Sequence, residues 1–183
     1  MRRTAAVRHA TTWERLLEES VLCLHRDEAS LSAAQQKILA SVRQTDPMLA
    51  GRTVLVIDDD LRNIFALTSL LERHNLEVMH AENGRAGIDM LKAKPDVDVV
   101  LMDIMMPDMD GYQTTRAIRQ IPELKALPII ALTAKAMKGD RDKCIQAGAS
   151  DYVAKPVDVE YLLSVIRVSI ARREQQMDAA MSA

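Results

Sequence analysis

The apolar run at 99–102 (VVLM), which stops at the carboxylate of Asp103, constrains the fold more than any other stretch of this 183-residue chain. Consecutive apolar residues bounded by turn-forming residues are typical of a strand buried on both faces. Turn-forming Pro107 and Gly111 follow shortly afterwards. In open α/β sheets, ligands bind at the carboxyl ends of the strands. A carboxylate in that position is held rigidly and still reaches solvent, so Asp103 is the candidate reactive group.

Short runs of strand-forming residues alternate with helical patterns along the rest of the chain. The other expected strands lie at 53–57, 77–81, 127–134 and 151–154. Apolar residues at spacings of three and four predict helices at 61–74, 83–91, 112–121, 138–147 and from 159 onward, the last with Asp158 as N-cap. This alternation predicts an α/β fold, with a doubly wound five-stranded parallel sheet, helices on both faces and right-handed crossovers.

Two amphipathic helical patterns, at 13–24 and 31–42, precede this alternating region. The dipeptide Asp46-Pro47 ends the second one, because the residue before a proline is pushed away from helical geometry. Neither helix is long enough to be stable alone, so its apolar stripe must dock on something. The expected division of the chain is an N-terminal helical extension or linker at 1–50, a domain at 51–176 and a flexible tail at 177–183.

Composition and charge exclude several classes of function. The net charge of −2 gives no reason to expect a nucleic-acid partner, and 3% aromatic residues argue against a stacking surface for single strands. No uncharged apolar run approaches the ~18 residues of a membrane span, so we expect no membrane contact. Cys23 and Cys144 form no CxxC pair, which favours two reduced thiols in a cytoplasmic protein.

Chemically active residues stand at the ends of four of the expected strands. Asp58 and Asp59 follow the first strand, Asp103 ends the third, Thr133 ends the fourth and Lys155 follows the fifth. Carboxylates that converge repel one another unless a cation neutralises them. Their hard oxygens suit Mg²⁺, which also takes phosphate oxygens, and an ammonium and a hydroxyl can bind further phosphate oxygens. The set therefore matches phosphoryl transfer to a carboxylate nucleophile.

Four motifs, in this order, resemble the receiver domain of two-component signalling, the module of response regulators and hybrid histidine kinases. They are VLVIDDD (54–60), LMDIMMPDMDG (101–111), ALTAKA (131–136) and DYVAKP (151–156). The resemblance covers residues 52 to about 172. It implies a flavodoxin-like sheet with strand order 2-1-3-4-5. It also implies Mg²⁺ as cofactor and a histidine kinase or phosphotransfer protein as phosphoryl donor.

The resemblance assigns a metal site and a phosphoacceptor. Asp103 resembles the phosphoacceptor, Asp59 the direct Mg²⁺ ligand, and Asp58 a partner that binds the ion through water. The backbone carbonyl of Met105 would complete the protein's share of the metal shell. Lys135 and Met105 flank the site, where they are expected to influence how long the phosphoryl group survives.

The same resemblance assigns the groups that respond to the phosphoryl group. Lys155 would pair with the aspartate and then with the phosphoryl group, and Thr133 would be the switch hydroxyl. Tyr152 would be the aromatic residue whose orientation follows that hydroxyl. The Lys155–Pro156 peptide bond would be cis, a form essentially restricted to proline.

The residues in and around the motifs predict the kind of protein to which this domain belongs. The stretches DDDLRNIFALTSLLE (58–72) and ALTAKAMKGDRDKCIQAGASDYVAKPVD (131–158) are most similar to receivers of hybrid sensor histidine kinases. Residues 12–46 resemble the helical connection that precedes such a receiver, and we expect them to dock on this domain or on a second chain, as in a homodimer. A stand-alone single-domain response regulator is the alternative.

A phosphatase and an interaction scaffold are the competing functions. A phosphatase with Asp103 as nucleophile would turn over external phosphate esters, and a scaffold that resembles a receiver would need none of the site residues. The run DMDG (108–111) also resembles the nucleophile motif of haloacid-dehalogenase phosphatases or part of a calcium loop, but Pro107 separates it from the strand end and the other calcium ligands are missing. His25 matches no phosphoacceptor histidine pattern well, which favours a plain surface or interface histidine.

Overall fold

A computed structural model of the chain describes residues 46–94, 96–134 and 140–181. Several expectations fall outside these residues. They are the two helices before Asp46, the docking of the segment that contains Trp13, the place of His25 and the position of Lys135.

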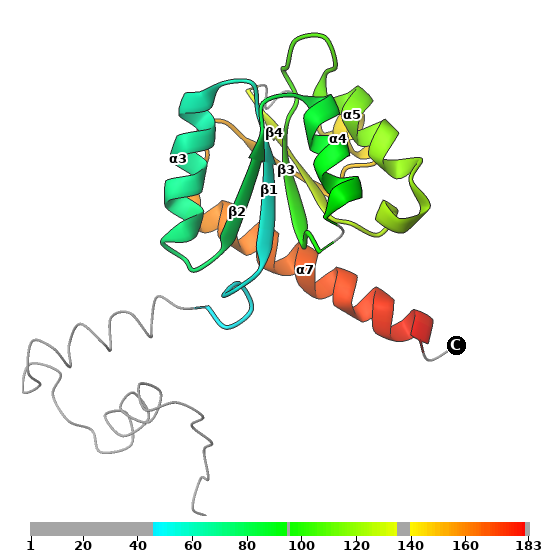
Figure 1. Ribbon diagram of the computed structural model, residues 1–183. Coiled ribbons are helices and arrows are strands. Elements are labelled where there is room, and N and C mark those ends of the chain that lie inside the picture. Colours follow the sequence, from blue (N-terminus) through cyan, green and yellow to red (C-terminus); the bar gives the residue numbers. More distant parts are fainter. Residues whose placement is uncertain (1–45, 95, 135–139, 182–183) are drawn as a thin grey trace, which may run out of the picture. The chain divides into compact units, whose positions relative to one another are not determined.

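Five parallel strands form one sheet in the order β2-β1-β3-β4-β5, which confirms the predicted fold class and strand order. The register sets Val56 of β1 beside Leu101 of β3, and Leu101 beside Ile130 of β4. Because the strands are parallel, their carboxyl ends meet at one edge of the sheet, at the top of Figure 1. The strands are β1 Thr53–Ile57, β2 Glu77–Ala81, β3 Val99–Asp103, β4 Ile129–Thr133 and β5 Asp151–Ala154.

Helices connect the strands. In the part of the chain that the structure describes, they are α3 Leu61–Glu72, α4 Gly84–Ala93, α5 Gly111–Arg119, α6 Asp140–Ala147 and α7 Val159–Met181, with a 3₁₀ turn, η2, at Pro122–Leu124. The helix predicted up to residue 121 ends at Arg119, and η2 begins at Pro122 because proline cannot continue an α-helix. Of the described helices, none has the length and apolar character that crossing a membrane requires.

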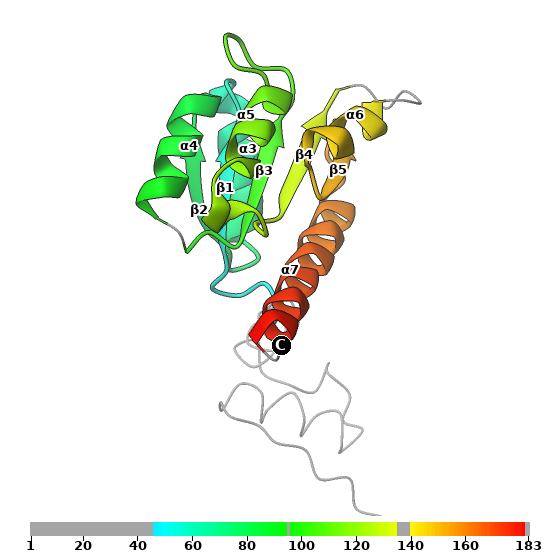
Figure 2. The same cartoon turned by 90° about the vertical axis from the view of Figure 1, so that its right-hand side faces the viewer.

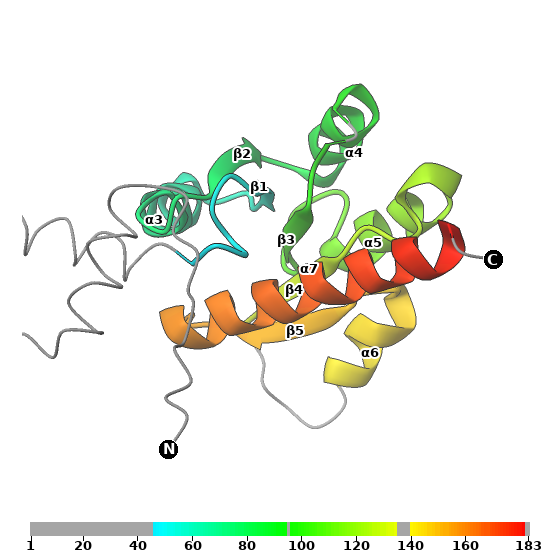
Figure 3. The same cartoon turned by 90° about the horizontal axis from the view of Figure 1, so that it is seen from below.

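The sheet separates two apolar layers of the core. Val54 and Val56 pack with α3 and α7 on one face, whereas Leu55 and Ile57 pack with α4 and α5 on the other. Figure 1 shows α3 and α4 on opposite sides of β1, and Figure 3 shows α6 beside β5 at the edge of the sheet. Burial on both faces explains why the strands read as uninterrupted apolar runs instead of alternating patterns.

Polar side chains set where the helices begin. At an N-cap, a side-chain oxygen accepts a backbone N–H that the helix leaves unpaired. Asp158 caps α7, as predicted, by accepting the N–H of Tyr161 at 2.8 Å. Asp60 and Asn83 do the same for α3 and α4, each at 2.9 Å. The acids and amides that follow the strands therefore also start the helices that cover the sheet.

Helix α7 continues to Met181, into the segment from residue 177 that was expected to be a tail. Figure 2 shows its last turns extending past the lower ends of the strands. Arg173 donates to the backbone carbonyls that precede β3, and Glu174 forms an ion pair with Arg52. Both contacts lie about one turn before residue 177. The Gln, Ala and Met residues that follow are good helix formers, so the helix continues beyond its last predicted apolar position.

The compact unit begins before the boundary expected at residue 51. It starts at Met48, and Leu49 is buried in the apolar cluster that α3 and α7 form on the sheet. Gly51 then turns the chain into β1 with a φ of 75°, which favours glycine, and its N–H donates to the carbonyl of Asn75 at 2.8 Å. The segment before β1 is therefore part of the packed fold.

Replacing Leu49 tests this packing. We expect Leu49→Ala to lower the free energy of unfolding by about 2–5 kcal/mol, because it leaves a cavity under α3 and α7. The matched control Met48→Ala, at a partly exposed side chain, should change it by no more than about 0.5 kcal/mol. Urea denaturation of the full chain measures both. Equal effects of the two substitutions would contradict the assignment of Leu49 to the core.

Candidate functional site

Three carboxylates meet at the carboxyl edge of the sheet. One oxygen from each of Asp58, Asp59 and Asp103 lies within 4.8 Å of the other two. Asp58 is fully buried, Asp103 is buried and Asp59 is exposed. The structure thus brings together the three acids that the sequence assigned to one site. It also gives that site one open side, where Asp59 faces solvent.

The topology explains why these acids converge. Strands β1 and β3 are neighbours, with Ile57 beside Met102, so the residues that follow them lie side by side. The N–H of Asp58 donates to the carbonyl of Ala81 at 3.2 Å, which continues the pairing of β1 with β2. The start of α5 packs closely against the end of β3. A Cβ on Gly111, the first residue of α5, would lie 2.2 Å from the carbonyl oxygen of Asp103. Only glycine permits this approach of α5 to the end of β3.

Lys155 brings a positive charge to the acids. Its Nζ lies 2.9 Å from Oδ2 of Asp58 and 3.0 Å from Oδ1 of Asp103, so a single ammonium bridges the residues that end β1 and β3. Burial disfavours the charged form of the lysine. The hydrogen bonds to Asp58 and Asp103 outweigh that effect and raise the pKa of Lys155 above its usual value. The ammonium is therefore a permanent part of the site at neutral pH.

The other predicted residues lie around this centre. Thr133 is buried at the end of β4, and its carbonyl accepts the N–H of Lys155 at 2.7 Å. Tyr152 is half-buried on β5 and packs against the small apolar cluster of α6 and the ends of β3 and β4. The Lys155–Pro156 peptide bond is cis. Met105 follows two residues after Asp103, and its side chain is exposed.

Sequence reasoning missed Asn63. Its Nδ2 lies 3.1 Å and 3.2 Å from the two carboxylate oxygens of Asp58. An asparagine in the first turn of a helix is a weak signal, because such residues usually cap the helix or face water. Only the direction in which α3 leaves β1 shows that this amide reaches the site.

Asp60, the third acid of the DDD run, does not join the metal cluster. It caps α3 and pairs with Arg62 at 2.6 Å. The hydrogen bonds from the Arg62 side chain and backbone lower the pKa of Asp60 to about 2. Asp60 therefore serves the helix, whereas Asp58 and Asp59 serve the site.

The DMDG run also has a structural explanation. Asp110 and Gln113 form a capping box at the start of α5, with Asp110 accepting the N–H of Gln113 at 2.7 Å. Asp108 is exposed in a left-handed turn, φ 61°, beyond the end of β3. The leading acid of this run is therefore not at a strand end, as the phosphatase interpretation requires, and Asp103 keeps the role of candidate nucleophile.

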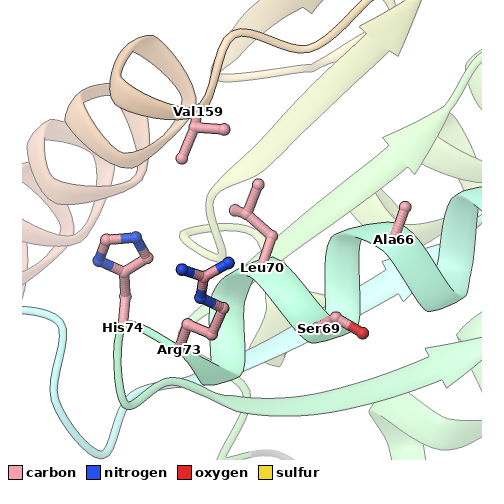
Figure 4. Close-up of a pocket in the computed structure, with 6 residues that line it drawn as sticks. All are labelled: Ala66, Ser69, Leu70, Arg73, His74 and Val159. Carbon is pink, nitrogen blue, oxygen red and sulfur yellow. The ribbon is translucent and has the colours of Figure 1, made fainter.

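A hollow of about 450 Å³ lies away from the acids. Figure 4 shows Leu70 of α3, together with Arg73 and His74 just after that helix, on the side of the hollow opposite Val159 at the start of α7. None of the residues that the sequence assigned to the site lines it. The chemistry therefore lies at the sheet edge, where charged groups converge, and not in the hollow beside α3.

The donor set fits Mg²⁺. Two buried carboxylates and one exposed carboxylate offer hard oxygens in a partly open site. Mg²⁺ prefers such oxygens and keeps several of its waters. Three carboxylates gather here, and the one ammonium pairs with two of them, so negative groups outnumber positive ones. A divalent cation relieves the repulsion between like charges that this excess creates.

The comparisons with known proteins agree with this geometry. Residues 54–167 match the family described as the response regulator receiver domain. The chain belongs to this family.

Its relatives include both single-domain proteins and large kinases. The receiver is 41% identical to Protein PilH of Pseudomonas aeruginosa over 119 residues, which are 64% of this chain and 97% of PilH. It is 38% identical to the histidine kinase BarA of Escherichia coli over 122 residues, 67% of this chain but 13% of that kinase. Among solved structures, it is similar to the receiver domain of sensor histidine kinase PA1611 from Pseudomonas aeruginosa, which has a magnesium ion in its active-site cleft. That match has 34% identity and a TM-score of 0.62, and covers 67% of this chain and 99% of the other.

Mg²⁺ should stabilise the receiver through Asp59. At 100 times its dissociation constant, an ion that binds only the folded state adds about 2.7 kcal/mol to the free energy of unfolding. We expect a matching rise in melting temperature for the wild type and little or none for Asp59→Asn, measured by thermal denaturation with and without MgCl₂.

Asp60→Asn is the matched control for this experiment. It changes the neighbouring acid, keeps a side chain that can cap α3, and should leave the Mg²⁺-dependent rise intact. A rise of the same size in Asp59→Asn as in the wild type would place the cation elsewhere.

Proposed function

We propose that Asp103 accepts a phosphoryl group from a phosphohistidine on a histidine kinase or phosphotransfer protein, and that the receiver then switches conformation. The observation that carries this proposal is the placement of Asp103 within reach of two further carboxylates and 3.0 Å from the ammonium of Lys155. A buried nucleophile beside a cation and a metal-binding pair is suited to phosphoryl transfer. The match to the receiver family supports the same reaction.

The transfer step follows from these groups. A carboxylate oxygen of Asp103 attacks the phosphorus atom of the phosphohistidine, and the P–N bond breaks with its electron pair returning to the imidazole nitrogen. The product is an acyl phosphate on Asp103 and a free histidine on the donor. Asp58, Asp59 and the carbonyl of Met105 are the groups proposed to hold Mg²⁺, which when bound neutralises charge on phosphoryl oxygens. Attack by water on the phosphorus later breaks the acyl P–O bond, releases inorganic phosphate and restores the carboxylate.

The switch follows from the neighbours of Asp103. Lys155 holds one side of the carboxylate, and Thr133 stands at the end of the adjacent strand β4. The hydroxyl of Thr133 moves to the new phosphoryl oxygens, and Tyr152 moves towards the space that it leaves. Because Tyr152 packs with α6, the surface of α6, β5 and α7 changes with it. Phosphorylation thus shifts the population between two states through contacts that only one of them makes.

We further infer that this receiver serves a hybrid sensor histidine kinase in the cytoplasm. Its similarity to the receivers of BarA and PA1611 supports this setting. A stand-alone regulator is the second candidate, favoured by the match along 97% of PilH. Sequencing the coding region on both sides of residues 1–183 separates the two.

Labelling with a small phosphoryl donor tests the site. Acetyl phosphate with Mg²⁺ should add one phosphoryl group to the wild type and none to Asp103→Asn, because the amide is not a nucleophile towards phosphorus. Intact-mass spectrometry measures the added mass. The matched control Asp108→Asn changes the exposed acid of the same loop and should label like the wild type.

The same two variants separate the competing functions. Labelling that persists in Asp103→Asn and disappears in Asp108→Asn would move the nucleophile to the DMDG run. Sustained turnover of external phosphate esters would favour a phosphatase, and a wild type that takes no label would favour a scaffold.

Apolar side chains on the rim of the site support a protein donor. Leu61 and Phe65 are 59% and 75% exposed, one turn apart at the start of α3, and Met105 is 63% exposed after β3. Exposed large apolar residues beside a reactive group are typical of a surface that binds another protein. Their place beside the site suits contact with a protein that presents its phosphohistidine to Asp103.

Phe65→Ser should slow phosphoryl transfer from the protein donor but not from acetyl phosphate. Loss of an aromatic contact that is important at such an interface costs about 1.4 kcal/mol or more, which is at least about tenfold in affinity. Labelling by acetyl phosphate should not change, since a small donor needs no docking surface. Tyr161→Ser, at a half-exposed aromatic residue of α7, is the matched control. Equal slowing with both donors would show damage to the site instead of to docking.

A further inference from the structure

Asp58 is a buried carboxylate with an unusual set of partners. It is fully buried, and its oxygens accept hydrogen bonds from three residues. Lys155 Nζ donates to Oδ2 at 2.9 Å, and the N–H of Asp60 donates to Oδ1 at 2.9 Å. The third partner is Asn63, whose Nδ2 lies within hydrogen-bond distance of both oxygens, at 3.1 Å and 3.2 Å. A buried carboxylate is tolerated only when it is paired in this way.

The ammonium of Lys155 is shared between two carboxylates. It lies 2.9 Å from Asp58 and 3.0 Å from Asp103. In the proposed reaction, the phosphoryl group on Asp103 becomes a competing partner for the same ammonium. Asp58 would then keep only its neutral donors, the N–H of Asp60 and the amide of Asn63. Since a buried charge without partners is costly, those neutral donors decide how readily Lys155 can leave.

The amide of Asn63 is suited to this task. An ionised carboxylate only accepts hydrogen bonds, so the NH₂ group and not the carbonyl of Asn63 must face Asp58. The amide is neutral and does not titrate near neutral pH, so it supports the carboxylate without adding a charge that would repel a cation. It comes from the first turn of α3, which the Asp60 cap fixes to the end of β1.

We propose that Asn63 is a positioning residue of the phosphoacceptor site, which holds Asp58 in its metal-binding orientation and frees Lys155 to follow the phosphoryl group. This inference rests on the proposed function and adds a residue that neither the motifs nor the family resemblance assigned. Groups that orient metal-binding carboxylates strongly affect metal affinity, and their loss typically weakens binding by about 10- to 100-fold.

A purely structural role makes a different prediction. Asn63 lines a small hollow of about 290 Å³ with Leu70, Lys155 and Pro156, so it could matter only for packing. In that case its loss would lower stability without changing the affinity for Mg²⁺. Leu70→Ala supplies this comparison, because Leu70 lies on the same helix, lines the same hollow and has an apolar side chain that cannot donate to Asp58.

The experiment compares the unphosphorylated full chain in three forms: wild type, Asn63→Leu and Leu70→Ala. Leucine keeps the approximate size of the asparagine side chain and removes its donors. Isothermal titration with MgCl₂ should show binding about 10- to 100-fold weaker in Asn63→Leu and little changed in Leu70→Ala. Urea denaturation reports the loss of stability in each. Asn63→Ala replaces Asn63→Leu if the leucine variant does not fold.

A second readout separates positioning from chemistry. In acetyl phosphate labelling, the Mg²⁺ concentration for half-maximal rate should rise in Asn63→Leu, while the rate at saturating Mg²⁺ should fall much less. A wild-type Mg²⁺ affinity in both Asn63 variants would overturn the proposal, as would an equal loss of affinity in Leu70→Ala. A wild type that neither binds Mg²⁺ nor takes label would overturn the proposed function itself, and with it this inference.

Discussion

The arrangement of the site depends on one ammonium that compensates two buried carboxylates. Lys155 reaches from the end of β5 across the sheet edge to Asp58 and Asp103, which end β1 and β3. Without that cation, two carboxylates with almost no access to water would stand next to each other with no opposite charge beside them, which is costly. The pairing supplies that opposite charge, and three strands must be in register for it to form.

The same pairing leaves the site incomplete, which is what makes it responsive. One ammonium faces three carboxylates, an imbalance that a divalent cation would offset, and the proposed phosphoryl group would then compete for the lysine. Each arrival changes the partners of the others. A site whose charges were already balanced would attract a charged ligand only weakly, because no net charge would remain to interact with it.

The sheet turns these local changes into a change of surface. Thr133 and Tyr152 lie on β4 and β5, on the far side of β3 from the two candidate metal ligands that follow β1. Tyr152 packs in a small apolar cluster with Cys144 of α6, apart from the two large layers of the core. A small cluster can repack at less cost than the main core, since fewer contacts are exchanged. In the proposed switch, the acids on β1 and β3 would hold the metal while the side chains on β4 and β5 respond.

Many elements of the fold could be predicted from local patterns in the sequence. The strand at 53–57, the end of β3 at Asp103 and the cap at Asp158 follow from local patterns, because burial on both faces and capping chemistry leave marks on neighbouring residues. The full length of α7 could not be predicted in this way. Glu174, near the end of the helix, pairs with Arg52, a residue more than a hundred positions away. The burial of Leu49 was missed for the same reason.

By itself, the sequence determined that five strands and their helices form a parallel α/β sheet and that acids, a hydroxyl and an ammonium stand at strand ends. Those features are local, because each depends on a few adjacent residues and on the period of their apolar pattern. Only the tertiary structure decided that Asp60 and Asp110 serve as caps, and that Asn63 faces Asp58. An acid or an amide near a helix start has several possible partners, and which one it reaches is set by the direction in which the helix leaves the sheet.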